Sequence, residues 1–174
     1  MSSTPDNELK ELLRRYICTH RMQLCSMQLQ SKLQAVSKEY GREILKQQEG
    51  EFRFTALHCA AARCHKETIE IILHYVDVER RYELLEIQDS VGQTALHRAA
   101  SGGNIGPINS MIDSLRSPEL KIEFLKLEDK YGKTASARAI HSRKIPAATH
   151  LAKIYRQLNA KVEKKKVVLE GKGN

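Results

Sequence analysis

DSVGQTALHRAASGG, residues 89–103, decides how the rest of this 174-residue chain is interpreted, because the stretch recurs. Extended to ELLEIQDSVGQTALHRAASGG (83–103), it aligns at an offset of 40 with EFLKLEDKYGKTASARAIHSR (123–143). TALHCAAA (55–62) aligns with TALHRAAS (94–101) at an offset of 39. Self-similarity at a fixed spacing of roughly 20–50 residues is the signature of stacked repeat architectures. The sequence therefore predicts a solenoid built from units of about 40 residues.

Each unit is predicted to contain three helices. The first begins at a threonine whose hydroxyl can cap the exposed backbone N–H groups of the first turn. A second, outer helix follows a short break and carries Ile and Leu at helical spacing. A third, short helix begins at a Ser or Asp, with a Glu two residues later that complements the helix dipole. The first helices are expected to begin at Thr55, Thr94 and Thr134, and the third helices at Ser37, Asp77 and Ser117.

TALHCAAARCHKETIEIIL (55–73) and DSVGQTALHRAASGG resemble ankyrin repeats, in which D-x-x-G-x-T-P-L-H-x-A-A-x-x-G-H precedes an apolar outer helix. The resemblance implies an all-α, L-shaped stack of helix pairs whose concave face grips partner proteins. It also implies that the motif histidines hydrogen-bond to backbone and tie neighbouring units together. The residues that carry the structural motif are Thr55, His58, Gly92, Thr94, His97, Gly132 and Thr134.

Three features depart from the ankyrin pattern. The motif proline is replaced by alanine, and the period of about 40 exceeds the ankyrin period of 33, so we expect a third helix to replace or extend the usual hairpin finger. In the last unit Ser136-Ala137 replaces Leu-His, and RYICTHRM replaces the motif in the first unit. Atypical end units suit a solenoid, because its terminal faces meet water.

We therefore expect an ankyrin-like domain over residues 1–160, in about four units with degenerate terminal caps. A basic flexible tail is expected to follow it. The predicted segments are a degenerate unit (8–48), two clear repeats (52–89 and 92–129), a degenerate C-terminal unit (132–160) and the tail (161–174).

The net charge of +8 arises from 29 basic and 21 acidic residues. The segment 161–174 contributes +3, and we take the remaining +5 to be spread over residues 1–160. This balance mildly favours acidic partners and does not by itself indicate nucleic acid. The basic tail is interpreted as a solvated terminus, with nuclear import or an acidic surface as the alternative role. It lacks the interleaved aromatic side chains on which bases stack.

The sequence favours a cytoplasmic location, with the nucleus as the alternative. No stretch of about 18 apolar residues is present to span a membrane, and the N-terminus lacks the apolar core of a secretory signal. The cysteines show no small-scaffold spacing and are interpreted as reduced thiols. They are Cys18, Cys25, Cys59 and Cys64.

We predict no catalytic residue, no cofactor and no metal ligand, and hence no enzyme. His58-Cys59 and Cys64-His65 resemble a zinc-ligand set, but both histidines occupy the repeat's own His positions and Cys64 replaces its usual Gly. Cys18 and Cys25 share a helix face and are assigned to the core. No glycine-rich phosphate loop is found, because Ser101-Gly102-Gly103-Asn104 is the turn between two helices of a unit.

Four arginines are the candidate partner-binding residues. Arg98 and Arg138 lie one repeat apart, with Arg63 and Arg143 nearby. Because stacked helices lie about 10 Å apart, these arginines are predicted to form a basic stripe on the concave side. The alternative is that they are ordinary exposed side chains.

The predicted function is a non-catalytic protein–protein interaction module, an adaptor, scaffold or inhibitor. We expect a monomer that binds another protein through an acidic surface or peptide, without a membrane or nucleic-acid partner. The alternative is a basic surface that binds nucleic acid or another acidic polymer. Salt separates the two, since phosphate-driven binding weakens steeply as salt rises.

Overall fold

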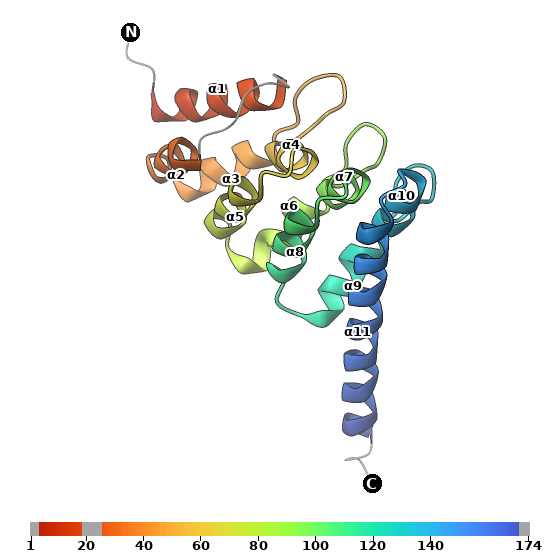
Figure 1. Ribbon diagram of the computed structural model, residues 1–174. Helices are drawn as coiled ribbons and strands as arrows, with labels where there is room; N and C mark the ends of the chain where they lie inside the picture. Colours follow the sequence, from red (N-terminus) through yellow and green to blue (C-terminus); the bar gives the residue numbers. More distant parts are fainter. Residues whose placement is uncertain (1–3, 19–25, 171–174) are drawn as a thin grey trace.

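The computed structural model describes residues 4–18 and 26–170, which form a stack of four helical units (Figure 1). No strand occurs in this part of the chain, and the predicted all-α fold is confirmed. The first unit contains α1 (Pro5–Cys18), α2 (Ser26–Gln34) and α3 (Lys38–Lys46). The second contains α4 (Ala56–Ala62), α5 (Lys66–Tyr75), the 3-10 helix η1 (Val78–Arg80) and α6 (Arg81–Leu85). The third contains α7 (Ala95–Gly102), α8 (Ile105–Asp113) and α9 (Pro118–Lys126), and the fourth contains α10 (Ala135–His141) and α11 (Ile145–Glu170).

The helices form parallel rows that run the length of the stack (Figure 1). The inner row is α1, α4, α7 and α10, and each of these helices packs against the next. The outer helices α2, α5 and α8 contact one another in the same order. The inner helices approach closely because the residues between them are small: Ala60, Ala61, Ala99 and Ala100 are fully buried. The core therefore runs through the stack as one continuous layer between the rows.

The motif histidines join each unit to the next. His58 Nδ1 accepts a hydrogen bond from the backbone N–H of Thr55 (3.3 Å), and its Nε2 lies 3.0 Å from the carbonyl oxygen of Gln93 in the following unit. His97 does the same with Thr94 (3.2 Å) and with the carbonyl of Lys133 (3.0 Å). Both rings therefore carry their proton on Nε2, which donates across the unit boundary. These bonds match the role that the ankyrin pattern implied for the two histidines.

A second ladder of hydrogen bonds joins the turns that precede the inner helices. Glu49 and Phe54 exchange backbone hydrogen bonds of 2.9 and 3.0 Å, so a short hairpin finger is retained and the third helix extends it. Gln48 donates to the carbonyl of Gln88 (2.7 Å), and Gln88 donates to that of Glu128 (3.0 Å). These partners are 40 residues apart, which is the repeat length found in the sequence.

Gly92 shows why the finger requires a glycine at this position. Its φ is +78°, in the left-handed region that favours glycine. A Cβ at this site would also lie 2.6 Å from the backbone nitrogen of Lys130 in the next finger. Gly132 has a φ of +65°, and a Cβ at this site would meet only the Glu128 carboxylate, at 4.0 Å.

Two of the three predicted caps of the third helices are confirmed. Ser37 accepts a hydrogen bond from the N–H of Tyr40 (3.3 Å), and Ser117 accepts one from that of Leu120 (3.1 Å). Asp77 makes no such bond and precedes the 3-10 helix η1. Its carboxylate is held instead by Arg42 of the first unit at 2.9 Å. An ion pair between units has therefore replaced a local cap.

The flexible tail expected over 161–174 is instead helical as far as Glu170, where α11 ends. Residues 161–170 contain strong helix formers and neither Gly nor Pro, so nothing in them ends the helix. Lys165 of this segment reaches Glu119 of α9 (3.9 Å), and α11 packs along α9. The outer and third helices of the other units are thus replaced here by one helix of 26 residues.

Cys64→Gly is expected to raise the free energy of unfolding by about 0.5–1 kcal/mol. Cys64 follows α4 with a φ of +62°, where Gly103 follows α7 with a φ of +79°. Only the first position carries a side chain that resists this conformation, and Cys64 is exposed, so little packing is lost. Urea unfolding measures the change. Gly103→Ala, the reverse exchange in the next unit, is expected to be destabilising, and loss of stability in Cys64→Gly would contradict the argument.

Candidate partner-binding surface

The inner face is the surface formed by α4, α7, α10 and the turns at 49–54, 89–93 and 129–133. Arg98 and Arg138 lie on its successive helices, as predicted, and their side chains are 26% and 14% exposed. Each guanidinium is held from two sides, by a carboxylate and by an aromatic ring. The two arginines are therefore fixed groups rather than extended solvated chains.

The carboxylate that holds Arg98 is Asp89, whose side chain is 0% exposed. One carboxylate oxygen accepts hydrogen bonds from the N–H groups of Val91 and Gln93, both at 2.9 Å. The other accepts a hydrogen bond from Arg98 Nε at 2.8 Å. Both oxygens of the Asp89 carboxylate thus accept hydrogen bonds, and the charge is paired with Arg98. A buried charge is tolerated only when it is paired and hydrogen-bonded in this way.

Asp129 repeats the arrangement one unit later. It accepts hydrogen bonds from the N–H groups of Tyr131 (2.9 Å) and Lys133 (3.1 Å) and from Arg138. Burial raises the pKa of this carboxyl, but the hydrogen bonds from Arg138 and the two amides outweigh burial, and the net effect lowers the pKa. The spacing of nine residues between Asp and Arg recurs in both units and is the sequence signal for this ion pair.

Aromatic rings cover the other side of both guanidinium groups. The Arg98 guanidinium lies 4.7 Å from the centre of the Phe54 ring, and that of Arg138 lies 5.0 Å from the Tyr131 ring. Phe52 stacks on Phe54 at 5.5 Å between ring centres and is 53% exposed. The inner face thus carries aromatic and arginine groups in fixed positions.

The other two candidate arginines do not continue the stripe. Arg63 donates to the carbonyl of Tyr16 (2.8 Å) and lies over its ring at 4.9 Å, so it holds α4 against α1. Arg143 is exposed just after α10, with a φ of +58°. Arg63 and Arg143 therefore lack the combined pairing with a buried aspartate and an aromatic ring that Arg98 and Arg138 share. A partner-binding role for the four stays a prediction.

The residues weighed as zinc ligands have other partners in the structure. Both ring nitrogens of His58 are hydrogen-bonded, and His65 Nδ1 lies 2.9 Å from the Tyr16 hydroxyl. Cys59 is buried and Cys64 is exposed. The described residues contain no group of three or more His, Cys, Asp or Glu placed to hold a metal ion. Cys25 and the side chain of Cys18 lie outside the described residues.

The two buried motif histidines, His58 and His97, have lowered pKa values. Burial lowers the pKa of His58 to about 4, with a smaller contribution from the nearby Arg98 charge. Burial likewise lowers the pKa of His97. Both rings are therefore neutral near pH 7, as their hydrogen bonds require.

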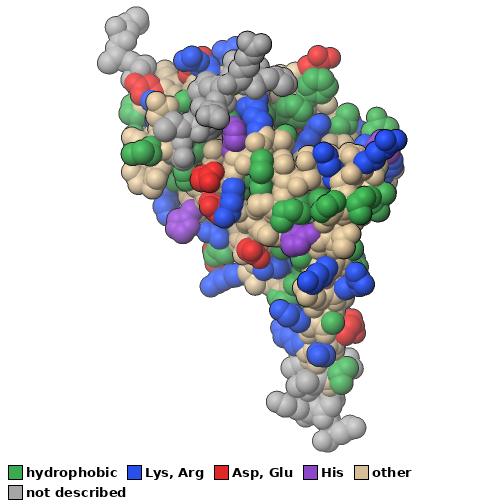
Figure 2. Space-filling model, in the orientation of Figure 1, with side chains coloured by type: hydrophobic (Ala, Val, Ile, Leu, Met, Phe, Trp, Pro, Cys, Tyr) green, Lys and Arg blue, Asp and Glu red, His purple; other side chains and the backbone are tan. Residues whose placement is uncertain are grey.

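The positive charge of the chain is concentrated in its last quarter, which corrects our expectation that it is spread over 1–160. Residues 130–174 contain twelve Lys and Arg against two Asp and Glu, a net charge of +10. Residues 1–129 contain seventeen against nineteen, a net charge of −2. Figure 2 shows Lys and Arg side chains along the protruding part of α11.

The family described as "Ankyrin repeats (3 copies)" matches residues 10–114, which is more than half of the chain. The chain belongs to the ankyrin-repeat family. The match includes the first unit, whose motif is lost, and ends before the fourth.

Solved structures show the same ankyrin fold. A chain in the crystal structure of the yeast ribosomal protein Rps3 in complex with its chaperone Yar1 aligns with a TM-score of 0.62 at 22% identity. The alignment covers 90% of this chain and 96% of that one. A search of curated proteins finds no match. Within the described residues, no helix is both long enough and apolar enough to cross a membrane.

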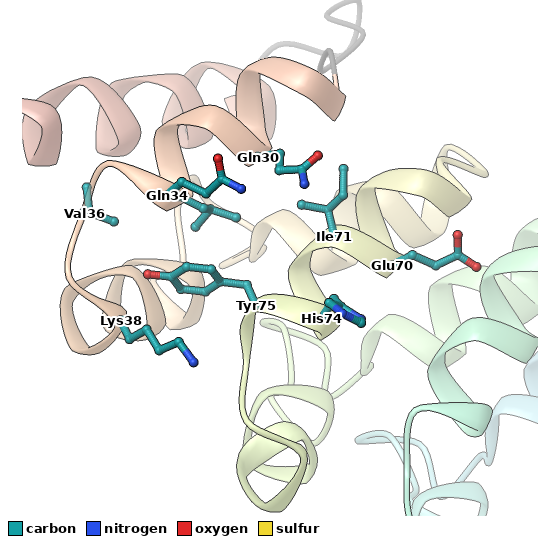
Figure 3. A pocket seen from close by; sticks show the side chains of 9 residues that line it. Gln30, Gln34, Val36, Lys38, Glu70, Ile71, His74 and Tyr75 are labelled. Carbon is teal, nitrogen blue, oxygen red and sulfur yellow. The ribbon is translucent and has the colours of Figure 1, made fainter.

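Among the clefts of the described ankyrin stack, two lie away from the arginine pairs and have partly apolar linings. One, of about 530 Å³, lies between α2, α3 and α5 on the outer side of the stack (Figure 3). Tyr75, Ile71 and Val36 line it together with polar side chains such as Gln34 and Lys38. The smaller, of about 280 Å³, lies where α9, α10 and α11 meet.

Proposed function

We propose that this ankyrin stack is a non-catalytic protein-binding module, an adaptor, scaffold or inhibitor, that holds its partner against the inner face. The observation that supports it is the pair of arginines that buried carboxylates and aromatic rings hold in place on successive inner helices. Aromatic side chains and arginine are enriched at the cores of protein interfaces. Here they are ordered before a partner arrives, so binding need not order them.

The ladders between units support the same proposal. Side-chain and backbone hydrogen bonds join successive fingers, including the bond from Ser90 N–H to the carbonyl of Phe52 at 2.9 Å. A surface fixed in this way presents one shape to a partner. The likeness to a structure in which a chaperone is bound to a ribosomal protein is compatible with protein binding. We place the protein in the cytoplasm or nucleus, as a monomer.

Binding of nucleic acid or another acidic polymer is the second candidate function, and the net charge of +10 on residues 130–174 favours it. The two functions respond differently to salt. Binding through phosphate contacts weakens by orders of magnitude as salt rises, whereas an interface centred on apolar contacts weakens modestly.

The proposal is tested by affinity capture from a lysate at low and moderate salt, followed by direct binding of the purified captured protein. Phe52→Ser/Val91→Ser changes two finger side chains and leaves both Asp–Arg pairs intact. We expect this variant to lose the captured protein. Met27→Ser is the matched control, because Met27 is an exposed apolar residue on α2, outside the inner face.

The outcome is read from what remains bound at moderate salt. Loss of a protein in the finger variant, with retention in Met27→Ser, supports binding at the inner face. Capture of nucleic acid, or equal retention by both variants, contradicts it. Substitutions of Arg98 or Arg138 are unsuited to this test, because each would leave a buried aspartate, Asp89 or Asp129, without its countercharge and destabilise the fold.

A further inference from the structure

The fourth unit has a cleft because one motif residue is missing. Leu57 and Leu96, the motif leucines of the second and third units, are 1% and 0% exposed. Ser136 occupies the equivalent position in the fourth unit. The cleft of about 280 Å³ opens beside it, between Leu125 of α9 and Leu151 and Tyr155 of α11. It is large enough for an aliphatic side chain of the kind that Ser136 no longer supplies.

One basic residue lines this cleft, and two more are neighbours of its lining residues in the sequence. Lys126 lines it, while Lys133 and Arg156 adjoin the lining residues Thr134 and Tyr155 in the sequence. Most Lys and Arg side chains of the unit, Lys133 and Arg156 among them, form no ion pair with any described residue. These are Lys133, Arg143, Lys144, Lys153, Arg156, Lys161 and Lys164. In the first unit, by contrast, Arg42 and Lys46 form ion pairs with Asp77 and Glu83 of the second unit.

The side of α10 that faces away from α7, together with the start of α11, also carries exposed apolar side chains. Ile140 stands where the other units have Ala61 and Ala100, which the next inner helix buries completely. An isoleucine at this position holds a following helix away from close contact. Ile140 and Ile145 are exposed, at 58% and 56%. Among the described residues, most of the large apolar side chains that are exposed lie in residues 130–167.

We infer that the fourth unit is a docking surface for an acidic segment of a partner protein, with an aliphatic side chain of that segment seated in the cleft beside Ser136. The carboxylates of the segment pair with the unpaired Lys and Arg side chains that flank α10 and lie along α11. This inference rests on the proposed function and adds a second site, separate from the inner face. The charge of +10 and the apolar cleft together select a segment that is both acidic and aliphatic.

The apolar groups of this surface favour protein over nucleic acid. Binding of single-stranded nucleic acid uses aromatic faces on which bases stack. The exposed apolar residues here are mainly aliphatic, and the Arg138 guanidinium covers one face of Tyr131. The cleft at Ser136 is lined mostly by aliphatic and aromatic carbon, which suits a leucine side chain.

The inference is tested with three fluorescent probes: a peptide EEDELEDEE, the same peptide with serine in place of leucine, and a single-stranded 20-mer oligonucleotide. Ser136→Leu restores the motif leucine and fills the cleft. We expect it to weaken binding of the leucine peptide about tenfold, since one buried aliphatic side chain is worth roughly that factor or more. Its melting temperature is expected to equal or exceed that of the native chain, which excludes misfolding as the cause.

Charge variants complete the test. Lys126→Glu/Arg156→Glu is expected to weaken both peptides about tenfold or more, whereas the control Lys10→Glu/Lys38→Glu, in the first unit, changes binding less than twofold. The inference is overturned if Ser136→Leu leaves the affinity for the leucine peptide unchanged, if neither peptide binds, or if the oligonucleotide binds more tightly than both. A captured partner that Phe52→Ser/Val91→Ser loses and Ser136→Leu retains would overturn this inference alone and leave the inner-face proposal standing.

Discussion

Arg98→Ala is expected to lower the free energy of unfolding by about 3–5 kcal/mol, the range found when one partner of a buried ion pair is removed. The cause is Asp89, whose carboxylate remains at 0% exposure with no countercharge. Its two amide hydrogen bonds, from Val91 and Gln93, hold it in the turn, so it cannot move to water. The loss of contact with the Phe54 ring adds to the effect. Urea unfolding at pH 7 measures the change.

Two further variants isolate the buried charge as the cause. Asp89→Asn/Arg98→Ala removes the charge but keeps an oxygen to accept the two amide hydrogen bonds, so we expect it to recover part of the lost stability. Arg116→Ala removes an exposed pair with Glu79 and is expected to change stability by at most about 1 kcal/mol. If Arg98→Ala were as mild as Arg116→Ala, the Asp–Arg pair would not support the fold as described.

Acidification from pH 7.5 to pH 5 is expected to remove about 2 kcal/mol of stability through His58 alone. Its folded pKa is about 4, whereas histidine in an unfolded chain has a pKa of about 6.5. The unfolded chain therefore takes up a proton first as the pH falls. The stabilising contribution of the neutral ring is complete above pH 6.5 and is lost progressively as the pH falls toward 4. His97, with its lowered pKa, acts in the same direction.

Urea unfolding at several pH values between 7.5 and 5 measures this dependence. His58→Gln is expected to be less stable at pH 7.5, because it loses the bond to Gln93, and to lose stability less steeply with acid. His74→Gln, at an exposed position, should keep the native slope. A native chain whose stability is flat over this range would contradict the neutral, buried state of His58.

The surroundings of Arg98 and Arg138 were only partly predictable from the sequence. The spacing of 40 correctly placed Arg98 and Arg138 on successive inner helices. Both proposed environments, a free stripe and ordinary exposure, missed the carboxylates that neutralise them. The Asp-to-Arg spacing of nine residues was available in both units, but a nine-residue separation brings two side chains together only once the turn between them has folded.

The sequence by itself determined the repeat, the helical class, the threonine starts of α4, α7 and α10, and the serine caps of α3 and α9. These features depend on local periodicity and on hydrogen bonds that span three residues, so a single segment contains all the information they need. The glycine of the finger and the histidines of the motif recur at fixed positions in the sequence, but their contacts with the next unit form only when the units stack.

Only the tertiary structure decided which residues each charged side chain pairs with and which helices pack together. Asp77 forms an ion pair with Arg42 of the first unit instead of capping a helix. Residues 161–170, where a tail was expected, continue α11, and this helix packs along α9. The cleft beside Ser136 has walls from two other helices, with Leu125 of α9 on one side and Leu151 and Tyr155 of α11 on the other. Each outcome depends on groups far apart in the chain that approach only when the units stack, and no local pattern records that distance.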